Sequence, residues 1–144
     1  MNNRMDEINK STRKKARYLQ SADMESFNPI TEKIIGCAYD VSNTLGVGFL
    51  EKVYENALAH EIRKAGLKVI QQQCIQVWYD GIVVGEYIAD LVVEGCVLVE
   101  IKAVKEFDNI HQAQCMNYLK ATGMRICLLL NFGSQHVGTK RIVV

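Results

Sequence analysis

Apolar residues recur along this chain with two different periods, and each period predicts one kind of secondary structure. Three segments carry an apolar residue at every third or fourth position, which is typical of helices with one buried face. Pro29 stands at an early helical position, Asp108 is a good N-terminal cap, and Gly66 and Gly123 suit the turns that end helices. The predicted helices cover residues 30–45, 50–65 and 109–122.

Runs of apolar residues between the second and third helices, and after the third, predict strands. The pair Asp80-Gly81 separates the first two runs and is a strong signal for a two-residue hairpin turn. Glu94-Gly95 separates the second run from the third, so these three strands form an antiparallel meander. The predicted strands cover residues 69–79, 82–93, 96–104 and 125–131, with an edge strand over residues 141–144.

Length and composition fit one globular domain without a membrane span. The chain has 144 residues, of which 49% are hydrophobic, so it can bury a sizeable core. No apolar run approaches the length of a membrane span, and the N-terminus lacks the pattern of a secretory signal. The five cysteines are scattered, which favours reduced thiols over a disulfide frame or a zinc site. These features predict a cytoplasmic protein.

Charge is distributed unevenly between the N-terminus and the rest of the chain. The net charge of +1 gives no basic footprint for nucleic acid over the whole protein. Residues 1–20, however, hold six basic and two acidic residues, a net charge of +4. We therefore predict a flexible basic arm over residues 1–27 and a domain over residues 28–144. The arm could contact phosphates, although a solvated tail without a binding role is the simpler interpretation.

Charged residues interrupt two of the predicted strands at neighbouring positions of the meander. Asp90 lies in the second strand, and Glu100 and Lys102 lie two residues apart in the third, so the latter two share one face. Charges within apolar runs cost free energy unless they are paired or bound to metal. This set would suit a divalent cation with a lysine beside it, whereas a solvated face or a cross-strand ion pair is the simpler alternative.

Two of the predicted helices also carry polar residues beside their apolar stripes. Glu51 and Glu55 share one face of the second helix. They are either solvated surface acids, or one of them leans over the sheet and supplies a further carboxylate. In the third helix, Gln114 and Tyr118 share a face with His111, for which a backbone hydrogen-bond partner is the favoured interpretation.

Together these motifs resemble the PD-(D/E)xK nuclease superfamily. Within it the chain is similar to the small bacterial and archaeal proteins of the GxxExxY family, whose naming motif reads here Gly48-Phe-Leu-Glu51-Lys-Val-Tyr54. The pair Gln114-x-x-x-Tyr118 matches an element of the RecB-like branch. The resemblance covers residues 28–144. The other matching stretches are Leu45–Gly48, Asp90–Glu94, Val99–Ala103, His111–Gln114 and Asn131–Gly133.

The resemblance implies a fold, a cofactor and a role for each matching residue. The fold is an α/β (α+β) restriction-endonuclease-like core, in which helices flank a mixed β-sheet, and the activity is metal-dependent phosphodiester cleavage. Mg²⁺ or Mn²⁺ would be held by Asp90, Glu100, the backbone carbonyl of Ile101, and Glu51 directly or through water. Lys102 would orient the attacking water or neutralise charge in the transition state, and Gln114 and Tyr118 would position the phosphate or the water.

Three functions follow as hypotheses. The first is a Mg²⁺-dependent deoxyribonuclease that binds DNA in repair, recombination or defence. The second is a catalytically silent nuclease-fold module that binds nucleic acid or a partner protein. The third is a nuclease acting on RNA, which would use the same site. The polar strand over residues 69–76 could pair with its copy across a two-fold axis, which would give a homodimer.

Overall fold

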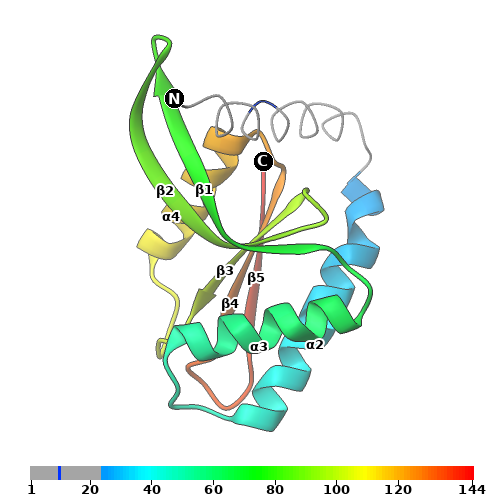
Figure 1. The fold of residues 1–144 in the computed structure, drawn as a ribbon. Helices are drawn as coiled ribbons and strands as arrows, with labels where there is room; N and C mark the ends of the chain where they lie inside the picture. Colours follow the sequence, from blue (N-terminus) through cyan, green and yellow to red (C-terminus); the bar gives the residue numbers. More distant parts are fainter. Residues whose placement is uncertain (1–9, 11–23) are drawn as a thin grey trace.

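The structure is a computed structural model, which describes residue 10 and residues 24–144. A five-stranded sheet lies between two layers of helices (Figure 1). The helices are α2 (Asn28–Leu45) and α3 (Glu51–Lys64) on one face and α4 (Asn109–Thr122) on the other, preceded by the short 3-10 helix η1 (Met24–Phe27). The strands are β1 (Val69–Tyr79), β2 (Ile82–Val93), β3 (Val97–Lys102), β4 (Ile126–Asn131) and β5 (Gly138–Val143).

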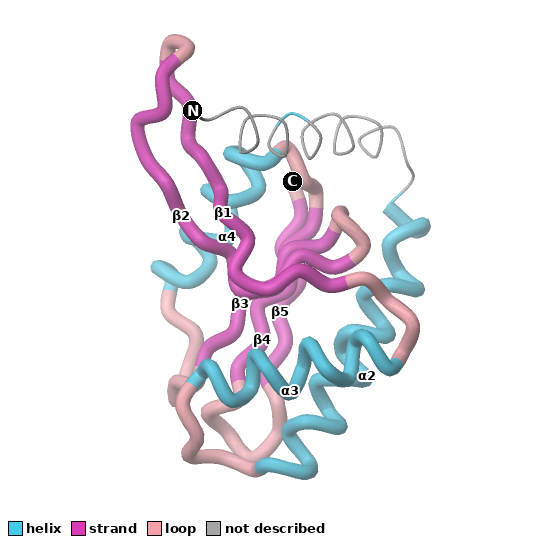
Figure 2. The backbone as a smooth tube through the Cα atoms, viewed as in Figure 1, coloured by secondary structure: helices cyan, strands magenta, loops and turns pink. Residues whose placement is uncertain are grey.

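The strands lie side by side in the order of the sequence (Figure 2), and one neighbouring pair is parallel. β1, β2 and β3 form the predicted antiparallel meander. β3 and β4 run parallel because α4 carries the chain from one end of the sheet back to the other, and β5 returns antiparallel to β4. The mixed sheet flanked by helices confirms the predicted fold class.

Alternate residues of the inner strands enter two separate cores. In β3, Val97, Val99 and Ile101 pack with α2 and α3, whereas Leu98 packs with α4. Side chains two residues apart in a strand share a face. By this alternation, Glu100 and Lys102 lie on the α4 face with Leu98.

The observed element boundaries follow the predicted ones closely, except that β3 covers Val97–Lys102 rather than residues 96–104 and that the two ends of the domain differ. β5 begins at Gly138 rather than at residue 141, because it pairs with β4 along the whole of that strand. Phe27 is 2% exposed and packs in the core with α2, so residues 24–27 belong to the packed body. Apart from Lys10, residues 1–23 of the predicted basic arm lie outside the described residues.

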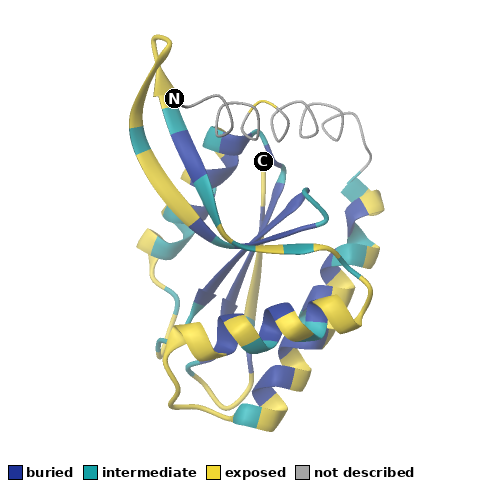
Figure 3. Ribbon diagram, viewed as in Figure 1, coloured by how far each residue is buried: buried dark blue, intermediate teal, exposed yellow. Residues whose placement is uncertain are grey.

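The β1–β2 hairpin extends well beyond the other strands. Only Leu91–Val93 of β2 pairs with β3, so residues 73–89 form a two-stranded ribbon, named here the β1–β2 arm. Most of its outward face is exposed (Figure 3). The arm closes at Asp80-Gly81, where both residues have positive φ angles, as the hairpin signal predicts.

Within residue 10 and residues 24–144, no helix combines the length and the apolar character that crossing a membrane requires.

Candidate active site

The acidic residues lie where β2 separates from β3. Leu91 and Val99 form the last backbone pair on this side, and the next position of each strand carries Asp90 and Glu100. The backbone N–H of Asp90 donates to Oε1 of Glu100 at 3.2 Å, and the N–H of Ile101 donates to Oδ2 of Asp90 at 2.8 Å. Carboxylate side chains thus replace carbonyl groups as the acceptors, and both carboxyl groups are held at the opening between the strands.

The neighbouring strand β1 is distorted at the same level. Gln72 stands opposite Asp90 and has a φ of 55°, whereas the other two non-glycine residues with positive φ among the described residues lie in tight turns. This conformation shifts the alternation of the strand. Val69 packs with α2 and α3 while Ile75, an even number of residues later, packs with α4. Backbone strain of this kind is typical of functional sites.

Glu55 of α3 is the helix carboxylate that lies buried beside this distortion. It is 3% exposed and accepts hydrogen bonds from Gln71 at 2.7 Å, from Lys52 at 2.9 Å, and from Gln72. Glu51 is exposed at the first residue of α3. Both carboxylates raise the pKa of Asp90, Glu55 more than Glu51, so Glu55 is the better placed of the two.

The charges at this opening are poorly balanced. Burial, reinforced by the neighbouring Asp90, raises the pKa of Glu100 from 4.5 to about 9. Burial also raises the pKa of Asp90, although the hydrogen bond from the Ile101 N–H opposes this. The positive charge of Lys102 lowers the pKa of both groups. Two carboxyl groups in this situation favour binding either a proton or a cation.

Two side chains of α4 lie over the sheet face that carries Glu100. Nε2 of Gln114 donates to the hydroxyl of Tyr118 at 2.8 Å, and that hydroxyl lies 3.4 Å from the carbonyl oxygen of Ile88. Burial raises the pKa of Tyr118 to about 12, and Glu100 adds to the effect. Asp90, Glu100 and Lys102 are named here the acid–acid–lysine set. The structure therefore brings Tyr118, with Gln114 hydrogen-bonded to it, to this set.

The donor atoms present fit a hard divalent cation in their chemistry. Asp90 and Glu100 offer carboxylate oxygens, which Mg²⁺ and Mn²⁺ prefer. Among the described residues, no three Asp, Glu, His or Cys side chains are grouped closely enough to hold a metal ion. The carboxylates of Asp90 and Glu100 are thus a pair, and any further ligand would come from a more distant acid, the backbone or water.

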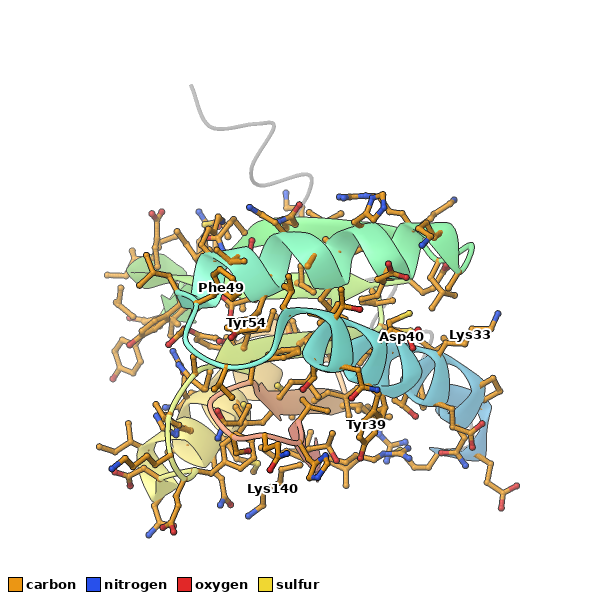
Figure 4. The ribbon with its side chains drawn as sticks, turned by 90° about the horizontal axis from the view of Figure 1, so that it is seen from below. Lys33, Tyr39, Asp40, Phe49, Tyr54 and Lys140 are labelled. Atoms are coloured by element: carbon orange, nitrogen blue, oxygen red, sulfur yellow. The ribbon has the colours of Figure 1, made fainter. Side chains whose placement is uncertain are left out.

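Tyr54, the last residue of the Gly48–Tyr54 motif, has a structural role. Its hydroxyl donates to the carbonyl of Gly46 at 2.6 Å and accepts from the N–H of Phe49 at 3.2 Å. Its ring stacks on Phe132 at 4.8 Å between centroids, and Figure 4 shows it tucked under α3 beside Phe49. Tyr54 therefore holds the loop of residues 46–50, which positions the start of α3 and, with it, Glu51 and Glu55.

Asn131 fixes the chain directly after Lys102. Its Oδ1 accepts from the N–H groups of Val104 at 3.0 Å and Gly133 at 2.9 Å, and its Nδ2 donates to the carbonyl of Val104 at 2.7 Å. A Cβ atom on Gly133 would lie 2.2 Å from the Val104 carbonyl oxygen, so only glycine fits there. These contacts, named here the Asn131 clamp, hold the end of β3.

His111 has a backbone hydrogen-bond partner, as the sequence analysis favours. Its Nδ1 accepts from the N–H of Asp108 at 3.0 Å, and the Asp108 side chain caps α4 in return. This capping box orients the first turn of α4, and Gln114 lies in the next turn.

The sequence alone selected Glu51 and missed the buried network around Glu55. A signal was present, since Glu55 lies beside the apolar stripe of α3, one turn from the fully buried Leu58. For Gln72 no signal exists, because the residue type does not indicate a left-handed conformation inside a strand. The Ile101 carbonyl stays a prediction, although the Ile101 N–H contacts Asp90.

A mixed sheet flanked by helices, with two acids and a lysine where two strands separate, is an arrangement suited to metal-assisted phosphodiester hydrolysis. The family model described as the PD-(D/E)XK nuclease superfamily matches residues 28–142. The chain therefore belongs to the PD-(D/E)XK nuclease superfamily, whose members generally use divalent metal ions and bind nucleic acid. Searches among curated proteins and among solved structures found no match.

Proposed function

We propose that this protein is a metal-dependent nuclease that hydrolyses phosphodiester bonds of DNA. The observation that carries the proposal is the pair of crowded carboxyl groups, Asp90 and Glu100, with the ammonium group of Lys102 beside them. Strongly shifted pKa values of neighbouring acids are typical of functional sites. In a chain of this superfamily, phosphodiester hydrolysis is the reaction that such a set serves best.

Asp90 and Glu100 would hold Mg²⁺ or Mn²⁺, with the Ile101 carbonyl as a further ligand. A helix carboxylate would assist directly or through water, and we assign this role to Glu55 before Glu51 because Glu55 is buried and acts more strongly on Asp90. A bound divalent cation supplies an acidified water and neutralises phosphate charge. Its charge would also let both carboxyl groups ionise at neutral pH.

The other residues of the site would act on the water and the phosphate. The Lys102 ammonium would orient the attacking water or neutralise charge on the transition state. Tyr118 stays protonated at neutral pH because its pKa is about 12, so its hydroxyl would serve as a hydrogen-bond donor and not as a base. Gln114, bonded to that hydroxyl, would fix its direction.

The proposed family and branch within the superfamily rest on sequence motifs. The Gly48–Tyr54 motif supports membership of the GxxExxY family, and Gln114 with Tyr118 supports the RecB-like branch. DNA repair, recombination or defence would be the setting. Because β1 is an edge strand, it could pair with its copy in a homodimer.

One observation favours a second candidate, a catalytically silent module that binds nucleic acid or a partner protein. Within the described part of the chain, the carboxylates form a pair rather than a group of three. Such a module would keep the fold and lack turnover.

A cleavage assay separates the two candidates. Labelled single- and double-stranded DNA and RNA are incubated with the wild type or Lys102→Ala, in Mg²⁺, in Mn²⁺ or with chelator. We expect metal-dependent cutting of DNA by the wild type and none by Lys102→Ala, which should still gain thermal stability from metal. No cutting by either protein, with no metal-induced rise in the melting temperature, would reject the nuclease in favour of the silent module.

A further inference from the structure

A cavity of about 430 Å³ lies between the β1–β2 arm and α4. This volume is in the range of pockets that hold small ligands. Val77, Trp78 and Tyr87 line it from the arm, and Asn117, Lys120 and Ala121 line it from α4. Among the described residues, the lining therefore combines two aromatic rings, one amide and one ammonium group, with no acidic side chain.

This pocket, named here the arm–α4 pocket, adjoins the candidate active site. The ring of Tyr87 lies 5.7 Å from the ring of Tyr118, at an angle of 50°. On α4, Asn117 and Ala121 flank the helical stripe that begins with Gln114 and continues through Tyr118. The pocket and the candidate active site are thus linked by the Tyr87–Tyr118 ring contact and by neighbouring positions of α4.

The chemistry of the lining selects one class of ligand. Exposed aromatic rings in a pocket suit the flat face of a nucleobase, and Trp78 and Tyr87 are 36% and 49% exposed. An ammonium group beside the rings suits the phosphate next to that base. A larger hollow of about 550 Å³ at the C-terminal end of α4 is lined, within the part of the chain that the structure describes, by no aromatic side chain, so there it lacks this combination.

We propose that the arm–α4 pocket binds one unpaired base of the nucleic acid strand, stacked on Trp78 and Tyr87, with Lys120 on the adjoining phosphate. This inference rests on the proposed function and deepens it, because it makes unpaired or locally opened nucleic acid the preferred substrate. In a paired duplex the base faces are covered by their neighbours, so a duplex would have to open before a base could enter.

The test uses the full chain in chelator, so that binding is measured without cleavage. Trp78 is the only tryptophan of the chain, and its fluorescence therefore reports on the pocket directly. The probes are single-stranded DNA, RNA of the same sequence, the corresponding duplex, and a single strand that keeps its phosphates but lacks its bases. We expect quenching of Trp78 by the single strands that carry bases, and little by the duplex or the base-free strand.

Two matched variants then separate stacking from any general effect of the arm. Trp78→Ala should weaken binding of the single strand by about tenfold, the scale expected for one stacked base, and Trp78→Phe should recover most of the loss. Tyr79→Ala removes the neighbouring aromatic, which is 73% exposed and outside the pocket, and should leave the affinity unchanged. Binding is followed by anisotropy of a labelled strand, and circular dichroism checks that each variant is folded.

Several outcomes would overturn the proposal. They are single-strand binding without quenching, equal binding of the base-free strand, equal losses in Trp78→Ala and Tyr79→Ala, or no binding of any single strand. The wild-type quenching experiment decides the matter even if a variant fails to fold. Metal-dependent cutting together with one of these outcomes would keep the nuclease and reject the pocket. Base-dependent quenching without cutting would keep the pocket and reject the nuclease.

Discussion

The acid–acid–lysine set and the Asn131 clamp both place polar side chains among the apolar strands of the sheet, and they differ in charge. Among the described residues, no buried side-chain nitrogen or oxygen lacks a hydrogen bond, so both regions are satisfied in that respect. The neutral amide of Asn131 needs nothing further. Asp90 and Glu100 accept N–H groups as well, yet burial still raises the pKa of both, reinforced by Glu55 for Asp90 and by Asp90 for Glu100.

This comparison distinguishes polar groups that hold the fold from polar groups that await a partner. An amide is fully satisfied by backbone groups, whereas two buried carboxyl groups also need a proton or a cation. Substitutions in the two regions should therefore have opposite consequences for activity and stability.

The largest expected effect is on catalysis, from Glu100→Gln. It removes one of the two carboxylates that would hold the metal, so cleavage should fall by about 10³-fold or more. Glu86→Gln makes the same chemical change at an exposed position of the β1–β2 arm and should leave the rate unchanged. Initial cleavage rates in Mg²⁺ measure both. Equal rates for Glu100→Gln and the wild type would remove Glu100 from the site.

The next effect is on stability, from Asn131→Ala. The change leaves the N–H groups of Val104 and Gly133 and the Val104 carbonyl without their partner. We expect the free energy of unfolding to fall by about 2–4 kcal/mol in urea denaturation. Asn43→Ala, on the exposed side of α2, is the control and should change it by less than about 0.5 kcal/mol. A loss of the same size in both variants would argue against the clamp.

A third prediction concerns the pH dependence of stability. The pKa of Glu100 is about 9 in the folded protein and 4.5 when unperturbed, so folding favours its protonated form. Its contribution is fully present below the unfolded pKa and is lost as the pH rises towards 9. The melting temperature of the metal-free wild type should therefore fall between about pH 5 and pH 9. Glu100→Gln should flatten this dependence, and Mg²⁺ should stabilise the wild type more at the upper end of the range.

Thermal melts across that pH range, with chelator and with Mg²⁺, measure these effects. The same slope in Glu100→Gln and the wild type would assign the pH dependence to other groups.

The smallest effect is expected from Tyr54→Phe. It removes the hydrogen bonds to Gly46 and Phe49 but keeps the stacking on Phe132, so it should cost about 1 kcal/mol of stability and little activity. Tyr39→Phe, at an exposed tyrosine of α2, should cost nothing measurable. A large loss of cleavage in folded Tyr54→Phe would instead give this hydroxyl a role in the site.

The sequence by itself determined the elements and the central residues of the candidate site. Turn residues such as Asp80-Gly81 and Gly123 act locally, because they favour positive φ angles whatever surrounds them, and the observed strands and helices end beside them. The alternation of a strand is equally local, which is why Glu100 and Lys102 could be assigned to one face before the structure was known.

Only the tertiary structure decided which groups meet at the site. Glu51 and Glu55 lie four residues apart on one helical face, so how closely each approaches Asp90 depends on how α3 crosses the sheet. The left-handed Gln72 and the arm–α4 pocket likewise arise from the packing of distant segments. Local propensity fixes where elements begin and end, whereas long-range packing fixes what their side chains touch, and the chemistry of this protein depends on the second.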